Sequence, residues 1–273
     1  MIGQHLLQSR IDQLIENDTF PRFTIFVGPK GSGKKTLAHL VYQKFGAGVF
    51  SNIGVSVDAV RQCIAQSYAV RGSQAIYLLA DADNMSNAAK NALLKVTEEP
   101  PNNAYFIMTL EDESNTLETI RSRATVFRMS AYKSTEIGVY FYDKYHTNHD
   151  ESEKQIVCDI CETPGEVDTL VSYGISDFYD YVQLVIDNIA EVSLANSFKI
   201  ASKVALKDTD EGYDLRLFWK AFINIVIDRA ILSNEPLDVV SITSRYLQKL
   251  RIRGINKQML IDSWILEVRD AWS

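Results

Sequence analysis

A glycine-rich run with two lysines stands at residues 28–36, GPKGSGKKT, directly after the apolar run FTIFV at 23–27. Its glycines let successive backbone N–H groups turn toward phosphate oxygens, and a helix that begins beside them adds its positive end. Lys34 supplies a point charge for the β- and γ-phosphates. The run predicts a binding loop for ATP or ADP, formed by Gly28, Pro29, Lys30, Gly31, Ser32, Gly33, Lys34, Lys35 and Thr36.

The residue after Lys34 departs from the usual pattern of such loops. That position normally carries Ser or Thr, whose hydroxyl binds Mg²⁺. Here it is Lys35, and Thr36 comes one residue later. A shift of one residue turns a helical side chain by about 100°, so Thr36 should not reach the same metal. The added ammonium also repels a cation, so we expect nucleotide binding in which Mg²⁺ is doubtful.

A phosphate-loop protein that hydrolyses ATP also needs a second strand that ends in acidic residues. One is an Asp that binds Mg²⁺, and the other is a Glu that orients the attacking water. A second segment of this chain stands where that strand belongs. Residues 76–101 read IYLLADADNMSNAAKNALLKVTEEPP. They resemble AAA+ clamp-loader subunits of the DNA polymerase III delta-prime (stator) type, which are related to replication factor C small subunits. The resemblance rests above all on the run from Asn91 to Lys95, NALLK, followed by EEPP from Glu98 to Pro101.

The acidic site of that family is altered in this chain. Aligned on the NALLK run, the metal-binding Asp is replaced by Ala80, and the Glu position holds the shorter Asp81. In the alternative register Asp81 is the metal ligand, and Ala82 takes the Glu position. A carboxylate drawn back by one methylene positions water poorly. Both registers predict that the isolated chain hydrolyses ATP negligibly.

An arginine follows in the segment TIRSRA at 119–124. Clamp-loader subunits carry Ser-Arg-Cys at this place, and Ser122 and Arg123 match while Ala124 replaces the Cys. The resemblance implies that Arg123 projects into the ATP of an adjacent subunit, where a guanidinium stabilises charge on the transferring phosphoryl group. The plainer interpretation is a surface arginine in a turn, of which Arg121 and Arg128 are neighbouring examples.

The elements that must position these residues are apolar strands alternating with helices. Strand candidates at 23–27, 49–55, 76–80, 104–110 and 125–128 are separated by helical stretches, including 34–45, 57–69 and 86–98. This order indicates a parallel sheet with helices on both faces. The resemblance implies an α/β AAA+ phosphate-loop core at 1–132, a small helical lid at 133–174 and an all-α collar for oligomerisation at 175–273. The apolar run 218–232 predicts a central helix of that collar.

Composition and cysteine spacing limit the cellular compartment and the metal sites that we expect. No apolar run reaches the roughly 18 residues of a membrane helix, and the N-terminus lacks the order of a secretion signal, so we expect a cytoplasmic protein without a membrane partner. The three cysteines, an odd number, argue against a disulfide framework. Cys158 and Cys161 form a CxxC, with His146 and His149 upstream, but a Cys pair within a helix is favoured over a metal site. The four-cysteine module of many bacterial relatives is absent, so no zinc is implied.

The charge of −7 argues against strong binding to DNA by this chain alone. The resemblance implies other clamp-loader subunits and a sliding clamp as partners, with primed DNA met through the assembly. The basic stretch 245–257 has two interpretations. It contacts DNA or an acidic partner, or it forms a solvated helix face, which is the favoured interpretation. Two other functions stay open: an active homo-oligomeric AAA+ ATPase of replication or recombination, and a nucleotide-sensing interaction protein without a clamp.

Overall fold

The chain divides into two units, Met1–Tyr132 and Lys133–Ser273. The computed structural model describes residues 3–70, 72–146, 149–189, 204, 212–233, 237–250, 252 and 254–272. The division of the second unit into a lid and a collar at residue 174 stays a prediction.

The first unit is built on a sheet of five parallel strands in the order β2-β3-β4-β1-β5. The strands are β1 Phe23–Val27, β2 Val49–Ile53, β3 Ala75–Leu79, β4 Ala104–Leu110 and β5 Thr125–Arg128. Val27, the last residue of β1, is in register with Leu110 of β4 and Arg128 of β5. The carboxyl ends of the three strands therefore meet at one edge, and the predicted α/β fold is confirmed.

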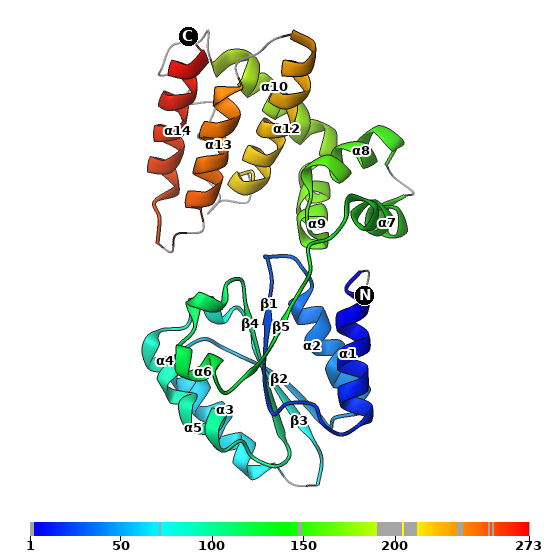
Figure 1. Ribbon diagram of the computed structural model, residues 1–273, viewed down its shortest axis with the longest axis vertical. Helices are drawn as coiled ribbons and strands as arrows, with labels where there is room; N and C mark the ends of the chain where they lie inside the picture. The colour runs from blue at the N-terminus through cyan, green and yellow to red at the C-terminus, as the bar shows by residue number, and fades with distance from the viewer. Residues whose placement is uncertain are drawn as a thin grey trace. The chain divides into compact units, whose positions relative to one another are not determined.

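Helices cover both faces of the sheet, as Figure 1 shows. On one face lie α1 His5–Glu16 and α2 Lys34–Phe45; on the other lie α3 Val57–Ala69, α4 Asn87–Ala92, α5 Leu94–Glu98 and α6 Glu118–Arg121. Successive side chains of a strand point to opposite faces, so Ile25 packs in one core with Val60 and Phe26 in the other with Leu37. Strands that are buried on both faces explain the uninterrupted apolar runs of the sequence.

Two helix starts in this unit are capped by serines, and one predicted helix is interrupted. Ser56 accepts a hydrogen bond from the N–H of Ala59 at 3.2 Å and begins α3, and Ser86 begins α4 in the same way.

The prediction of a single helix at 86–98 is wrong in one respect, because the helix is interrupted. At Leu93 the N–H donates to the carbonyl of Lys90, three residues back, at 3.1 Å. This tightened turn separates α4 from α5.

In the described residues of the second unit, helices are joined by turns and loops, without a strand. Its helices are α7 Ser134–Tyr145, α8 Glu151–Ile160, α9 Pro164–Tyr173, α10 Ile175–Ile189, α12 Leu215–Ser233, α13 Asp238–Lys249 and α14 Lys257–Trp272. Pro164 opens α9, a position where its missing N–H leaves no bond unmade. Across the described part of the whole chain, no helix has the length and apolar character needed to cross a bilayer.

The C-terminal helices pack around a cluster of aromatic rings. The Trp264 ring of α14 lies 5.0 Å from that of Phe222 and 5.8 Å from that of Trp219, both on α12. Its indole N–H donates to the Thr243 hydroxyl of α13 at 3.0 Å. One side chain thus joins three helices, and α12 is central to the packing, as its apolar sequence predicts.

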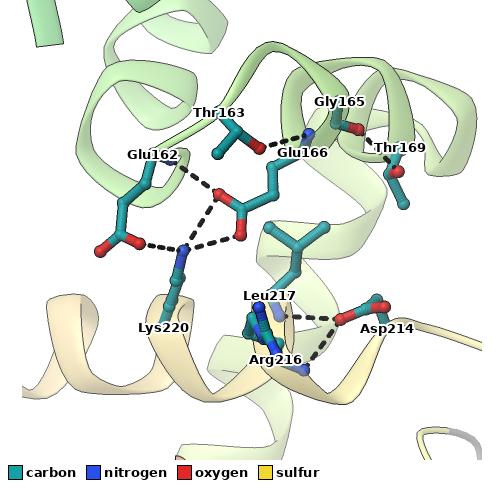
Figure 2. A network of polar contacts seen from close by, with 9 residues as sticks. All are labelled: Glu162, Thr163, Gly165, Glu166, Thr169, Asp214, Arg216, Leu217 and Lys220. Atoms are coloured by element: carbon teal, nitrogen blue, oxygen red, sulfur yellow. Dashed lines mark hydrogen bonds and ion pairs between the residues drawn. The ribbon is translucent and has the colours of Figure 1, made fainter. Parts of the chain in front are cut away.

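A buried ion pair joins α9 to α12 within the second unit (Figure 2). The Lys220 ammonium lies 2.8 Å from one carboxylate oxygen of Glu166 and 2.7 Å from Glu162. The side chains of Lys220 and Glu166 are only 10% and 14% exposed. Glu166 also accepts from the backbone N–H of Glu162, and its own N–H donates to the cap residue Thr163. The network therefore links the first turn of α9 to α12.

We expect Lys220→Met to lower the free energy of unfolding by about 2 kcal/mol, because it leaves the largely buried Glu166 carboxylate without its cation. The double variant with Glu166→Gln should lose less than the sum of the two single variants. Urea unfolding followed by far-UV circular dichroism measures both. Lys154→Met, which removes a lysine paired with the exposed Glu151, is the control and should not shift the unfolding midpoint. Strict additivity would show that the pair is not coupled.

Candidate functional site

The glycine-rich run forms the turn between β1 and α2. Gly31 and Gly33 have φ angles of 80° and 90°, a left-handed conformation that only glycine adopts easily. Gly33 is the N-cap of α2 and makes no side-chain cap. The first N–H groups of α2 and the positive end of the helix are thus available to an anion, and the loop fits a phosphate group.

Lys34 lies within this loop. Its side chain is buried, and its ammonium donates to the carbonyls of Gly28 at 2.7 Å and Pro29 at 2.8 Å. Burial lowers the pKa of Lys34 below its usual value, while the nearby carboxylates of Glu111, Asp83 and Asp81 act in the opposite direction. The loop therefore carries the predicted lysine at its centre.

The segment that follows β5 supports the loop from inside the unit. The Tyr132 hydroxyl donates to the carbonyl of Ser32 at 2.7 Å, and the Ser32 hydroxyl contacts the sulfur of Met129 at 3.4 Å. A Cβ atom at Gly28 would lie 3.0 Å from the Cβ of Met129, which explains the glycine there. Met129 and Tyr132 were not predicted, because no pattern in the sequence connects them to the distant loop.

Lys35 meets the degraded acidic segment. Its ammonium lies 2.6 Å from Oδ2 of Asp81, and both side chains are about half exposed, at 53% and 56%. Thr36 is exposed on the surface of α2. The position that usually offers a hydroxyl to Mg²⁺ thus carries a cation already bound to a neighbouring carboxylate. The residues present do not fit a magnesium ion.

The turn after β3 explains how Asp81 reaches Lys35. Ala80 is buried directly after the strand, and Asp81 adopts a left-handed conformation with φ of 52°. The N–H of Asp81 donates to the Thr109 hydroxyl on β4 at 2.9 Å. Such a conformation is uncommon for residues other than glycine but is tolerated by Asp. Thr109 was missed by sequence reasoning, although a polar residue near the end of an apolar strand is a usable signal.

The other acid of this turn has a structural role. Asp83, within the short helix η1 Ala82–Asn84, accepts from the N–H of Glu111 at 2.8 Å and from the side-chain amide of Asn115 at 2.8 Å. These bonds use both oxygens of the carboxylate. Asp83 therefore ties the turn after β3 to the loop after β4. It holds the carboxyl edge together beside the phosphate loop.

Potential metal ligands elsewhere in the described part of the chain lie apart from one another. Within the described ranges, no three His, Cys, Asp or Glu side chains gather as a metal site would require. Cys158 lies near the end of α8 and Cys161 directly after it, so the pair straddles the helix end, where a position within the helix was expected. Burial raises the pKa of both thiols. A raised pKa disfavours the thiolate that a metal needs.

Arg123 follows the short helix α6. Its guanidinium donates to the carbonyl of Thr119 at 2.9 Å and pairs with Oε1 of Glu98 at 2.9 Å. The Arg123 and Glu98 side chains are 40% and 53% exposed. The structure thus brings the arginine of the SRA segment against the EEPP segment, a contact that sequence reasoning did not predict. Arg128, by comparison, pairs with Glu113 at 2.6 Å.

Two further segments have contacts that the structure describes. Near the N-terminus, the carboxamide of Gln4 makes two hydrogen bonds with the backbone of Ser130. In the basic stretch, Arg245 pairs with Glu267 and Lys249 lies over the ring of Tyr246. Both contacts are within the unit. Arg251 and Arg253 lie outside the described residues.

The parallel sheet and the glycine-rich loop between β1 and α2 give the first unit the fold of AAA+ phosphate-loop proteins. A DNA polymerase III gamma subunit-related protein of Thermotoga maritima is similar in fold, with a TM-score of 0.50 at 14% identity over 97% of this chain and 99% of that one. The RuvB Holliday junction branch migration motor of Thermotoga maritima reaches a TM-score of 0.53 at 14% identity, covering 96% of this chain and 88% of that chain. At these identities the likeness concerns the fold alone.

Sequence comparison finds similarity to subunits of DNA polymerase III and replication factor C. The family model for "DNA polymerase III, delta subunit" matches residues 49–133. A replication factor C small subunit of Staphylothermus marinus is 27% identical over 149 residues, which are 50% of this chain and 45% of that protein. A DNA polymerase III subunit delta' of Yersinia pestis is 39% identical over 71 residues, 25% of this chain and 21% of that protein. The chain is related to the clamp-loader AAA+ subunits, and it matches less than half the length of these relatives.

Proposed function

We propose that this chain is the delta-prime-like stator of a clamp loader. In this role it helps a replicative DNA polymerase holoenzyme to load a sliding clamp on primed DNA. It supplies Arg123 to ATP held by a neighbouring AAA+ subunit, and it hydrolyses ATP negligibly itself. The phosphate loop retains the means to hold ATP or ADP. The relationship to clamp-loader subunits supports the proposal, and the residues of the site make it specific.

The observation that carries the proposal is the ion pair between Lys35 and Asp81. In phosphate-loop ATPases the corresponding hydroxyl and a nearby Asp hold Mg²⁺, which neutralises charge on the β- and γ-phosphates. Here Lys35 occupies the hydroxyl position and pairs with Asp81, and Ala80, at the aligned position of the metal-binding Asp, offers no carboxylate. The nucleotide site of this chain therefore lacks the residues that hold Mg²⁺ for hydrolysis. In the proposed role, the chain promotes ATP hydrolysis through a residue that it contributes to the site of another subunit.

Arg123 is the group suited to that contribution. It stands at the surface, in the segment that joins β4 to β5. A guanidinium keeps its charge at all physiological pH values and presents a planar fork of donors to phosphate oxygens. Its Glu98 partner is solvated, so the pair is weak enough to exchange for a phosphoryl group. We assign Arg123 as the arginine finger supplied in trans.

The rest of the chain suits a subunit of a larger assembly. With a net charge of −7, the chain would bind DNA weakly by itself, so primed DNA is met through the assembly. The partners are other clamp-loader AAA+ subunits and the sliding clamp. Residues 1–132 form the nucleotide-binding core, 133–174 the lid and 175–273 the collar that joins the subunits.

The first test is a steady-state ATPase assay on the purified chain with Mg²⁺. We expect turnover below about 0.1 per second, a tenth of the low end of typical enzyme rates. Faster turnover that persists when Arg123 is removed would favour the alternative of an active homo-oligomeric AAA+ ATPase. Mixing the chain with its ATPase partner subunits, the clamp and primed DNA should then raise hydrolysis well above that of the partners alone. No stimulation would contradict the stator role.

A further inference from the structure

We propose that the phosphate loop binds a nucleoside diphosphate or triphosphate without a divalent cation, with the Lys35 ammonium in the position and role of magnesium. The inference rests on the nucleotide binding proposed for this chain's own loop and does not depend on Arg123. Its failure would leave the arginine assignment standing, and the reverse also holds.

The first step is the position of Lys35 in the chain. It follows Lys34 directly, where a phosphate loop places the hydroxyl that binds Mg²⁺. It is the second residue of α2, so its backbone lies in the first turn, beside the N–H groups that face phosphate. A cation on this residue is therefore attached at the point where the loop normally recruits its metal.

The second step is the contact that Lys35 makes. Its ammonium spans the distance to Asp81 and meets Oδ2 at 2.6 Å. It thereby connects the phosphate loop to the end of β3. Phosphate-loop proteins that hydrolyse ATP hold Mg²⁺ between these two elements. The ammonium and a metal ion would share the same anionic neighbour, so one excludes the other by charge and by volume.

The third step concerns the remaining acids at this edge. Asp83 accepts hydrogen bonds from the Glu111 N–H and the Asn115 amide, so both of its oxygens have partners. Glu111 acts on Lys34 by its charge. Asp81 thus already has a cationic partner, and Asp83 already has hydrogen-bonding partners. The loop offers phosphate oxygens two lysines and the amides of a helix start, but it offers a divalent cation no ligand set.

The test is a titration of the full chain with a fluorescent ADP, with unlabelled ADP and ATP as competitors, in excess Mg²⁺ and in excess EDTA. We expect the two dissociation constants to agree within about threefold. An affinity that falls tenfold or more in EDTA, or no binding in either buffer, would overturn the proposal.

Variants separate the role of Lys35 from that of the loop in general. Lys35→Gln removes the charge and should weaken binding by roughly tenfold in both buffers, because a charge-assisted contact is lost. Lys35→Thr combined with Ala80→Asp restores a hydroxyl and a carboxylate and should make binding depend on Mg²⁺. Lys44→Gln, near the other end of α2 where Lys44 pairs with Asp12, is the matched control and should bind as the unaltered chain does. Unchanged binding by Lys35→Gln would contradict the inference.

Discussion

Replacing Arg123 with Ala is expected to lower ATP hydrolysis by the assembled clamp loader by about a thousandfold, the low end of what arginine fingers supplied in trans contribute. The guanidinium would stabilise negative charge on the transferring phosphoryl group of the neighbouring site. In this chain the change removes only a solvated ion pair with Glu98 and one hydrogen bond to Thr119. The measurement is the clamp- and DNA-stimulated ATPase rate of the reconstituted complex.

The matched control is Arg121→Ala, which removes the arginine that ends α6, two residues before Arg123. It should leave the rate of the complex nearly unchanged. Circular dichroism and size-exclusion chromatography must show that both variants fold and assemble, because a lost subunit would mimic a lost arginine. Equal rates for Arg123→Ala and the unaltered complex, or equal losses in both variants, would refute the assignment.

Trp264→Ala is expected to destabilise the second unit by about 3–5 kcal/mol, the range for removing a buried Trp or Phe side chain. Trp264 is fully buried, contacts aromatic rings on α12 and donates its indole N–H to Thr243. Its removal opens a cavity between three helices and leaves the buried Thr243 hydroxyl without this donor. Urea unfolding followed by far-UV circular dichroism measures the loss.

Trp272→Ala provides the comparison for that prediction. Trp272 ends α14, is half-buried and contacts the ring of Phe222 at 6.0 Å between ring centroids. Because less apolar surface is lost and no buried donor is removed, we expect the unfolding midpoint to shift much less than in Trp264→Ala. Equal shifts for the two variants would mean that the ring cluster is not the core of this unit.

The sheet was predictable because each strand carries its own local signal. The runs at 23–27 and 104–110 are apolar at nearly every position, and the strands β1 and β4 occupy the same residues. Burial on both faces produces such runs whatever the strand order is. The break at Leu93 was not predicted, since no proline or glycine marks it and only the hydrogen bond to Lys90 distinguishes that turn.

The site was predictable in its parts, while the contacts between those parts required the structure. Spacing predicted the phosphate loop and the departure at Lys35, and the resemblance to clamp-loader subunits predicted the changes at Ala80 and Asp81. That Lys35 and Asp81 form an ion pair across 46 positions could not be read from either segment, because pairing depends on the turn that Asp81 makes. The contact between Arg123 and Glu98 was missed for the same reason: it joins two segments that a strand separates in the sequence.

If Arg123 acts in trans as proposed, its solvated pair with Glu98 has a consequence for how the subunits recognise one another. Exposed ion pairs stabilise a fold by about 1 kcal/mol or less, because water competes for both partners. Such a pair restricts the rotamers of the guanidinium while leaving it exchangeable. When an adjoining protein excludes water around a phosphate, the charge-assisted bonds formed there are the stronger ones. In the role proposed for Arg123, the guanidinium would be held by Glu98 until docking brings a phosphate close, and it would then exchange one anionic partner for the other.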